Sequence, residues 1–174
     1  MTRRYILERA QLVPRPLSQV FPFFVDASNL EQLTPAFLKF QILTPAPIPM
    51  AAGTLINYRM RIAGVPQRWK TLIAVFDPPW RFVDVQLEGP YALWRHTHEF
   101  EESDGRTLIR DRVEYEMPLG LLGELARALF VRRMLERIFD FREARIAALF
   151  GTCALRRSHA ASLGPFPAGT SKDT

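Results

Sequence analysis

The sequence predicts an α+β fold in which a meander of antiparallel strands packs against one long C-terminal helix. Three observations support this prediction. Apolar residues recur at helical spacing between Leu121 and Phe150. Segments of about nine residues between positions 54 and 117 alternate apolar and polar side chains and are joined by short turns. No second long helix precedes the C-terminal one, so its broad apolar face requires a sheet as its partner.

The chain is predicted to begin with one strand and two short helices. Residues 5–13 are short and mixed in pattern, which fits a first strand. Pro16 suits the first turn of a helix whose apolar side consists of Val20, Phe21, Phe24 and Val25. Ser28 and Glu31 have the spacing of a capping box, which predicts a second short helix that ends at Pro35.

Six strands are predicted to follow. Their ranges are 37–43, 54–63, 67–76, 81–88, 93–101 and 107–117. Turn residues separate them at Gly64 to Pro66, Asp77 to Pro79, Gly89 to Pro90 and the acidic turn at 102–105. With the first strand they form a sheet of about seven strands.

The C-terminal helix is predicted to be a single amphipathic element of roughly 45 Å. Its apolar face is expected to include Leu122, Leu125, Leu129, Met134, Leu135, Ile138, Phe139, Phe141, Ala144, Ile146, Ala147 and Phe150. The opposite arc is expected to carry Arg127, Arg132, Arg133, Glu136, Arg137, Arg142, Glu143 and Arg145.

Length and composition predict one domain. The chain has 174 residues, of which 48% are hydrophobic and 24% charged, as in an ordinary globular domain. We place this domain at residues 1–151. Residues 152–174 lose helical periodicity and are rich in Ser, Gly, Pro and Thr, so we expect a flexible tail there.

The charge balance raises the question of a nucleic-acid partner. The formal net charge is +5 and the pI is about 9.9. However, the 23 basic residues are spread along the chain beside 18 acidic ones, and no nucleic-acid-binding motif accompanies them. We therefore predict no nucleic-acid partner and interpret the charges as solvated faces, with an anionic surface or partner as the alternative.

Cysteine content and hydropathy indicate a cytoplasmic protein. Cys153 is the single cysteine, so an intrachain disulfide and a cysteine-built metal site are excluded. The N-terminal residues contain no apolar run of signal-peptide length, and no window has the apolar stretch of a membrane span. We expect no stable membrane insertion.

Alternation predicts which side chains point into the fold. In 93–101 the charged residues share one face, so the opposite face carries Trp94, His96, His98 and Phe100. In 107–117 the apolar-leaning face carries Ile109, Asp111, Val113, Tyr115 and Met117. The inward faces of 54–63 and 67–76 include Tyr58 and Trp69.

This order of elements resembles the START-like (SRPBCC) superfamily, and in particular its small bacterial ligand-binding and cyclase/dehydrase-like members. The resemblance extends from Arg4 to Phe150. The stretches that carry it are FPFFVDASNLEQLTP, GTLINYRMRIAGVPQRWKTLI, DPPWRFVDVQLEGPYALWRHTHEFE and GRTLIRDRVEYEMPLG. It implies a helix-grip fold, in which a curved sheet wraps the C-terminal helix and a ligand cavity lies between them. It also implies that Phe82, Asp84 and Gln86 face this cavity.

The predicted ligand-binding residues combine aromatic walls with a polar cluster. They are Tyr58, Trp69, Phe82, Asp84, Gln86, Trp94, His96, His98, Asp111 and Tyr115. Such a mixture suits a small-molecule site, because apolar area supplies affinity and a few polar groups set the orientation. An unpaired buried polar group costs about 1–3 kcal/mol, so the polar members pair with one another, with water or with a ligand.

Three interpretations of the polar cluster stay open. It braces the sheet as a network whose members satisfy one another's hydrogen bonds, it orients a ligand, or it performs acid–base chemistry. In the enzymatic case the catalytic residues would be His96, His98, Asp84 and Asp111. The pair His96-x-His98 alone is a weak metal signal, so we predict no metal.

The predicted function is non-catalytic binding, as a carrier or sensor, of a hydrophobic or aromatic small molecule or lipid in the cavity. The alternative, implied by the resemblance, is a polyketide-type cyclase/dehydrase that uses a His/Asp pair in the same cavity. No nucleophile elbow, phosphate-cradling loop or dinucleotide fingerprint is present, so hydrolase, kinase and dehydrogenase functions are disfavoured. No cofactor is predicted, and a protein partner or homodimer is left open.

Overall fold

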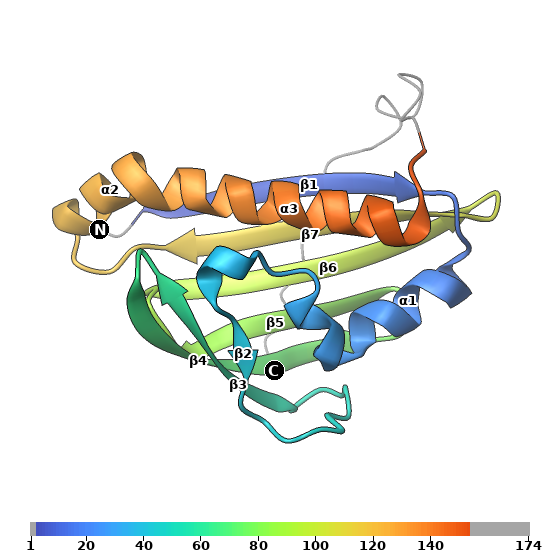
Figure 1. Ribbon diagram of the computed structural model, residues 1–174, viewed down its shortest axis with the longest axis horizontal. Helices are drawn as coiled ribbons and strands as arrows, with labels where there is room; N and C mark the ends of the chain where they lie inside the picture. The colour runs from blue at the N-terminus through green and yellow to red at the C-terminus, as the bar shows by residue number, and fades with distance from the viewer. Residues whose placement is uncertain (1–2, 154–174) are drawn as a thin grey trace, which may run out of the picture.

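The computed structural model describes residues 3–153 and has the order strand, short helices, strands, long helix (Figure 1). The strands are β1 (Arg4–Val13), β2 (Gln41–Ile42), β3 (Leu55–Ile62), β4 (Val65–Asp77), β5 (Arg81–Glu88), β6 (Leu93–Ser103) and β7 (Arg106–Glu116). The helices are α1 (Leu17–Val25), the 3-10 helices η1 (Ala27–Glu31) and η2 (Ala36–Leu38), α2 (Leu121–Ala126), the π-helical turn η3 (Arg127–Val131) and α3 (Arg132–Phe150). The predicted tail lies, apart from residues 152 and 153, outside the described residues.

One seven-stranded antiparallel sheet grips the C-terminal helix, which confirms the predicted fold class. Its strand order is β1-β7-β6-β5-β4-β3-β2. The register between β4 and β5 shifts at two places, between Lys70 and Thr71 and between Ile73 and Val75. Such irregularities bend a strand and increase its twist. Figure 1 shows the sheet curving beneath α3, with α1 closing one end.

Two predictions for the segment after α1 are wrong. The first short helix after α1 is capped by Asp26, whose carboxylate accepts hydrogen bonds from the backbone and hydroxyl of Ser28. Ser28 is therefore inside the helix and is not its cap. The predicted strand at 37–43 is reduced to Gln41–Ile42, because Lys39 adopts a left-handed backbone (φ 45°) that interrupts an extended chain.

The C-terminal helix is continuous but not uniformly amphipathic. In α3 the buried residues are Met134, Leu135, Phe139, Arg142 and Ile146, whose spacing marks one helical face. In the preceding segment Leu122, Leu125 and Leu129 are exposed, contrary to the prediction that they continue this face. The π-helical turn between the two segments adds a residue to the turn and so changes which side of the helix faces the sheet.

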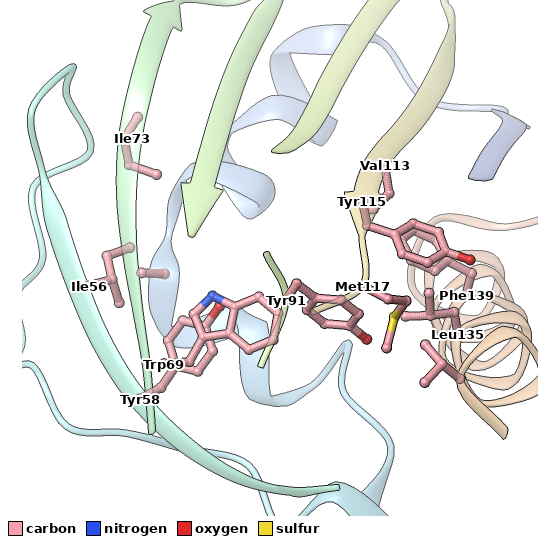
Figure 2. Close-up of a cluster of buried hydrophobic side chains, with 12 residues drawn as sticks. Ile56, Tyr58, Trp69, Ile73, Tyr91, Val113, Tyr115, Met117, Leu135 and Phe139 are labelled. Carbon is pink, nitrogen blue, oxygen red and sulfur yellow. The ribbon is translucent and has the colours of Figure 1, made fainter. Parts of the chain in front are cut away.

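Two apolar clusters fill the space between the sheet and the helices. One joins the ends of β3, β4, β6 and β7 to α3 and includes Tyr58, Trp69, Tyr91, Tyr115 and Leu135 (Figure 2). The other lies beneath α1 and includes Phe21, Phe24, Phe82, Phe100 and Ile146. Within residues 3–153 no helix has the length and apolar content needed to cross a bilayer.

Candidate functional site

A cavity of about 180 Å³ lies between the concave face of the sheet and α3. Met134, Leu135 and Ile138 of α3 form one side of it. The inward residues of β3 and β4 form the opposite side, and α1 with η1 closes the end through Phe24, Ala27 and Leu30. The helix therefore does not seal fully against the sheet, which leaves room for a small molecule.

Aromatic rings form much of the cavity wall. Tyr58 and Trp69 stack with their centroids 5.8 Å apart, and Trp94 meets Trp69 edge-on at 5.2 Å. Tyr91 lies 5.7 Å from Trp69 and extends from the sheet side toward α3 (Figure 2). Each ring contacts at least one other ring, which restricts the movement of this wall before any ligand arrives.

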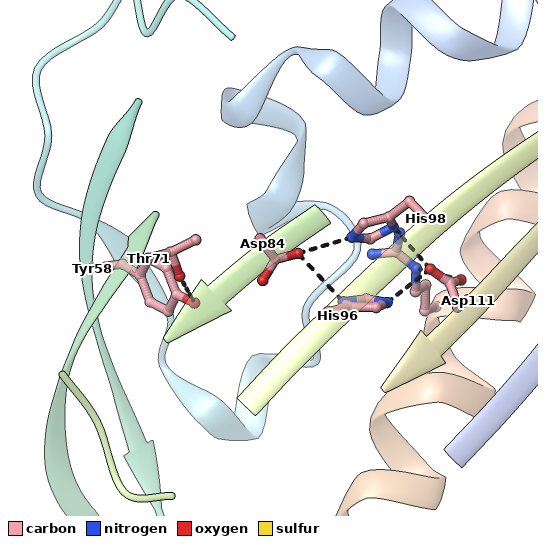
Figure 3. Close-up of polar contacts among 7 residues, drawn as sticks. Tyr58, Thr71, Asp84, His96, His98 and Asp111 are labelled. Carbon is pink, nitrogen blue, oxygen red and sulfur yellow. Dashed lines mark hydrogen bonds and ion pairs between the residues drawn. The ribbon is translucent and has the colours of Figure 1, made fainter. Parts of the chain in front are cut away.

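The polar part of the site is set by strand register. β5 pairs with β6 so that Asp84 is opposite His96, and β6 pairs with β7 so that His98 is opposite Asp111. Directly opposed residues share a face of the sheet, and this face is the concave one. Four ionisable side chains from three neighbouring strands are thereby brought together (Figure 3).

These four side chains alternate around a closed ring of contacts. His98 Nε2 lies 3.0 Å from Asp84 Oδ2, and its Nδ1 lies 2.9 Å from Asp111 Oδ1. His96 Nε2 lies 2.9 Å from Asp111 Oδ1. The remaining contact, between His96 Nδ1 and Asp84 Oδ2, is 3.7 Å long and is too long for a hydrogen bond. The ring is therefore looser on the side of Asp84.

Arg142 is a fifth member of the cluster, and the prediction that placed it on the charged arc of the helix is wrong. Its side chain is buried, its Nε donates to Asp111 Oδ2 at 3.3 Å, and its Nη2 lies 3.4 Å from His98 Nδ1. Arg142 follows Phe139 by three residues and precedes Ile146 by four, so it lies on the buried stripe of α3. This spacing is the sequence signal that could have predicted the burial of Arg142.

The cluster shifts the pKa values of its two histidines in opposite directions. Burial lowers the pKa of His96, the charge of His98 lowers it further, and together they outweigh the hydrogen bond to Asp111. Burial also acts to lower the pKa of His98, but its hydrogen bonds to Asp111 and Asp84 outweigh burial and raise that pKa. His98 therefore retains a proton to higher pH than His96 does.

Asp111 is the anion that anchors the cluster. Burial alone would raise its pKa, but the Arg142 guanidinium and hydrogen bonds from both histidines hold the pKa well below its usual value. The pairing of Asp111 with Arg142 and its contacts with both histidines offset part of the desolvation cost of burying these groups.

Seven of the ten predicted ligand-binding residues line the cavity. They are Tyr58, Trp69, Phe82, Asp84, Trp94, His96 and His98. Asp111 lies behind the histidines, and Tyr115 is buried in the apolar cluster beside Tyr5 and Tyr91. Gln86 is turned to the chain beyond β5, where its amide donates to the carbonyl of Tyr91 at 2.8 Å. These three residues do not border the cavity.

Sequence reasoning missed several residues that do border it. Arg142 and Tyr91 are the polar and aromatic examples, and the apolar ones include Phe40, Met50, Met134 and Ile138. Tyr91 lies in a turn, Phe40 follows a left-handed residue and Met50 lies in a loop, so strand alternation assigns no face to them.

Asp84, His96 and His98 are also the group within the described residues whose ligand atoms lie close enough to hold a metal ion, all within 4.8 Å of one another. However, these side chains already contact one another and Asp111. The Arg142 guanidinium, whose Nη2 lies 3.4 Å from His98 Nδ1, disfavours a cation here. The arrangement fits a hydrogen-bonded network better than a metal centre.

A curved antiparallel sheet that grips a C-terminal helix around a partly polar cavity defines a START-like helix-grip protein. The sequence points to the same class. The profile of the polyketide cyclase / dehydrase and lipid transport family matches residues 13–141, and the chain belongs to this family.

Solved structures share this fold at low sequence identity. The Zhui aromatase/cyclase from Streptomyces sp. R1128 has a TM-score of 0.67 and 17% identity, over 84% of this chain and 93% of that one. A Thermus thermophilus protein has a TM-score of 0.64 and 18% identity, over 83% and 99%. A START superfamily protein from Mycobacterium smegmatis has a TM-score of 0.60 and 15% identity, over 83% and 98%. A search of curated proteins found no significant sequence match.

Proposed function

We propose that this protein binds a hydrophobic or aromatic small molecule non-covalently in the cavity between the sheet and α3. The observation that carries the proposal is the aromatic cavity of about 180 Å³ with Asp84, His96 and His98 in its wall. A dry apolar cavity of roughly 150 Å³ binds benzene, so a space of this size suits a compact ligand of one or two rings. Apolar burial then supplies the affinity.

An unpaired donor in the wall indicates what the ligand carries. The indole Nε1–H of Trp69 is buried and has no hydrogen-bond partner among residues 3–153. A buried donor without a partner costs about 1–3 kcal/mol, and a ligand acceptor such as a carbonyl or phenol oxygen removes this cost. The neutral His96 offers an acceptor through Nδ1, because its Nε2 is bonded to Asp111. A ring bearing a hydroxyl group satisfies either atom.

Calorimetric titration with 2-naphthol and naphthalene tests this proposal. The wild type is expected to bind 2-naphthol more tightly than naphthalene by about 1–3 kcal/mol, because only the phenol pairs with the polar wall. Ile56 is buried and lines the cavity, so Ile56→Phe fills it and is expected to weaken naphthol binding at least about tenfold. Leu87→Phe, at an exposed position, is the matched control. Equal naphthol affinity in both variants contradicts binding in this cavity.

Proton transfer in the same cavity is the second candidate function. The observation that favours it is His96, whose pKa is lowered and which lines the cavity beside His98 and within reach of Asp84 and Asp111. A neutral imidazole can accept a proton from a carbon next to a ligand carbonyl. This is the chemistry that a cyclase/dehydrase requires.

Deuterium exchange into 2-tetralone separates binding from catalysis. A catalytic His96 takes a C1 proton of the bound ketone, and a deuteron from D2O replaces it, which proton NMR detects. If His96 acts as the base, the wild type accelerates exchange and His96→Gln does not, while both still bind 2-naphthol. If neither accelerates exchange above the buffer rate, the function is binding alone. A cytoplasmic location, a protein partner and a homodimer remain predictions from the sequence.

A further inference from the structure

The segment from Leu119 to Phe130, which comprises α2 and most of the π-helical turn, exposes apolar side chains to solvent. Leu121 keeps 89% of its surface exposed, and Leu119 keeps 79%. We call the exposed set the apolar patch; its members are Leu119, Leu121, Leu122, Leu125, Leu129 and Phe130. Contiguous exposed apolar surface of this kind marks an interaction site.

The charged side chains of this segment turn inward. It contains two, Glu124 and Arg127. Tyr5 on β1 donates its hydroxyl proton to the Glu124 carboxylate, and the Arg127 guanidinium lies 3.7 Å from the centroid of the Tyr5 ring. Arg127 Nε also lies 3.6 Å from Glu124 Oε2. Because both charges face Tyr5, no charge of the segment itself interrupts the apolar patch.

Arginines surround the apolar patch. Arg132 and Arg133 are exposed on the helical turn that follows Phe130. Arg3 lies 5.3 Å from the Tyr5 ring on the β1 side, and the neighbouring Arg4 is also exposed. Arg4 is paired with Glu114 and Glu116, and Arg132 with Glu136. The patch is thus apolar at its centre and carries partly paired arginines at its rim, within a chain of net charge +5.

We propose that the apolar patch docks the protein reversibly on an anionic membrane surface. Helices that bury leucines at the boundary of headgroups and acyl chains, with arginines near the phosphates, bind such surfaces without crossing them. Figure 1 shows α2 at one end of the molecule, beyond the tip of β7. This inference goes beyond ligand binding and does not require it.

The composition of the apolar patch favours a bilayer over a protein partner. Binding energy at protein interfaces concentrates in Trp, Tyr and Arg, and leucine is under-represented among the residues that dominate it. The patch consists of five leucines and one phenylalanine. Met134 and Leu135 line the cavity one turn after Phe130. Docking therefore brings the cavity close to the bilayer, where a hydrophobic ligand is most concentrated.

Vesicle co-sedimentation tests this proposal with the full chain. The wild type is expected to sediment with vesicles of phosphatidylcholine and phosphatidylglycerol, and more weakly at high salt, because salt screens the arginines. L121Q/L125Q is expected to lower the partition coefficient by about tenfold or more for each leucine. L87Q/L149Q replaces two exposed leucines elsewhere and is expected to bind like the wild type. R132Q/R133Q is expected to weaken binding to anionic vesicles and not to pure phosphatidylcholine.

Three results overturn the proposal. The first is that the wild type sediments with no vesicle. The second is that both double leucine variants bind equally. The third is a concentration-dependent dimer that L121Q/L125Q dissolves, since the apolar patch would then be covered by a second copy. Circular dichroism of each variant shows whether it is folded. Naphthol binding is measured in parallel, because it depends on the cavity and fails independently of docking.

Discussion

The two halves of the C-terminal helix use the same kinds of residues in opposite ways. In α3 the apolar residues Leu135, Phe139 and Ile146 are buried, and most arginines face solvent. In the segment from Leu119 to Phe130 the leucines face solvent, and the charged residues contact Tyr5. Both halves are comparably rich in apolar residues, so composition alone does not decide which side chains become buried.

What differs is the surface opposite each half. α3 lies over the sheet and is tied to it by the Arg142–Asp111 pair and by Gln11, whose side chain donates to the carbonyl of Glu143. The earlier half extends beyond the last residue of β7, where the sheet offers no concave face (Figure 1). A helical stripe is buried only where a partner layer exists. α3 therefore stabilises the fold, and the exposed face of α2 is free to contact something else.

The largest expected difference between the halves is in stability. Phe139→Ala is expected to lower the free energy of unfolding by about 3–5 kcal/mol, because it opens a cavity under α3. Leu129→Ala is expected to change it by less than about 0.5 kcal/mol, because Leu129 is exposed. Urea denaturation measures both. A loss above about 2 kcal/mol for Leu129→Ala would mean that the apolar patch packs against this chain.

The attachment of α2 to the body gives a smaller effect. Gly123 is buried, and a Cβ atom added there meets the carbonyl oxygen of Pro118 and the Cβ of Met117. Replacing glycine with alanine inside a helix normally gains about 1 kcal/mol. Here the clash outweighs this gain, so Gly123→Ala is expected to destabilise the protein by about 1–3 kcal/mol. A stabilised Gly123→Ala in thermal denaturation would mean that α2 shifts freely on the body.

The smallest expected effects are in the pH dependence near neutral pH, which should belong to the α3 half. The raised pKa of His98 stabilises the fold below pH 6.5, and this contribution is lost as the pH rises through the folded pKa. The lowered pKa of His96 acts oppositely, so stability falls as the pH drops below 6.5. Each slope is at most about 1.4 kcal/mol per pH unit.

Two histidine variants and one leucine variant check this pH dependence. His98→Gln should remove the decline on the alkaline side of the profile, and His96→Gln the decline on the acid side. Leu129→Gln should leave both slopes unchanged, because no ionisable group of the cluster contacts it. Denaturant unfolding at several pH values gives the slopes, which are compared instead of the absolute stabilities. If His98→Gln keeps the alkaline decline, another group is responsible for it.

The sheet and the inward histidines were predictable because they follow from local patterns. Period-two alternation fixed the faces of β3, β4, β6 and β7, and Asp-Pro-Pro and Gly-Pro turns fixed where strands end. His96 and His98 are both buried, as this alternation predicts. Whether the predicted residues bind a ligand remains to be measured.

Other features depend on contacts that no local pattern reports. Arg142 is buried because Asp111, distant in sequence, supplies its counter-charge. The exposure of Leu125 depends on where β7 ends relative to the helix. Asp26 caps the helix that Ser28 was predicted to begin, because its carboxylate accepts the backbone N–H of Ser28. This third signal was local, whereas contacts distant in sequence decided the first two.

The turn between β5 and β6 limits how far the cavity wall can move when a ligand binds. Gln86 donates to the carbonyl of Tyr91 and accepts from its backbone N–H at 3.4 Å, so its amide group pairs with Tyr91 as an adjacent strand would. The Tyr91 ring is thereby fixed against Trp69 and Trp94. This part of the wall loses its conformational freedom when the chain folds and not when a ligand enters. Tyr91 therefore selects ligands by a fixed shape. Any movement that lets a ligand enter has to involve other residues of the cavity wall.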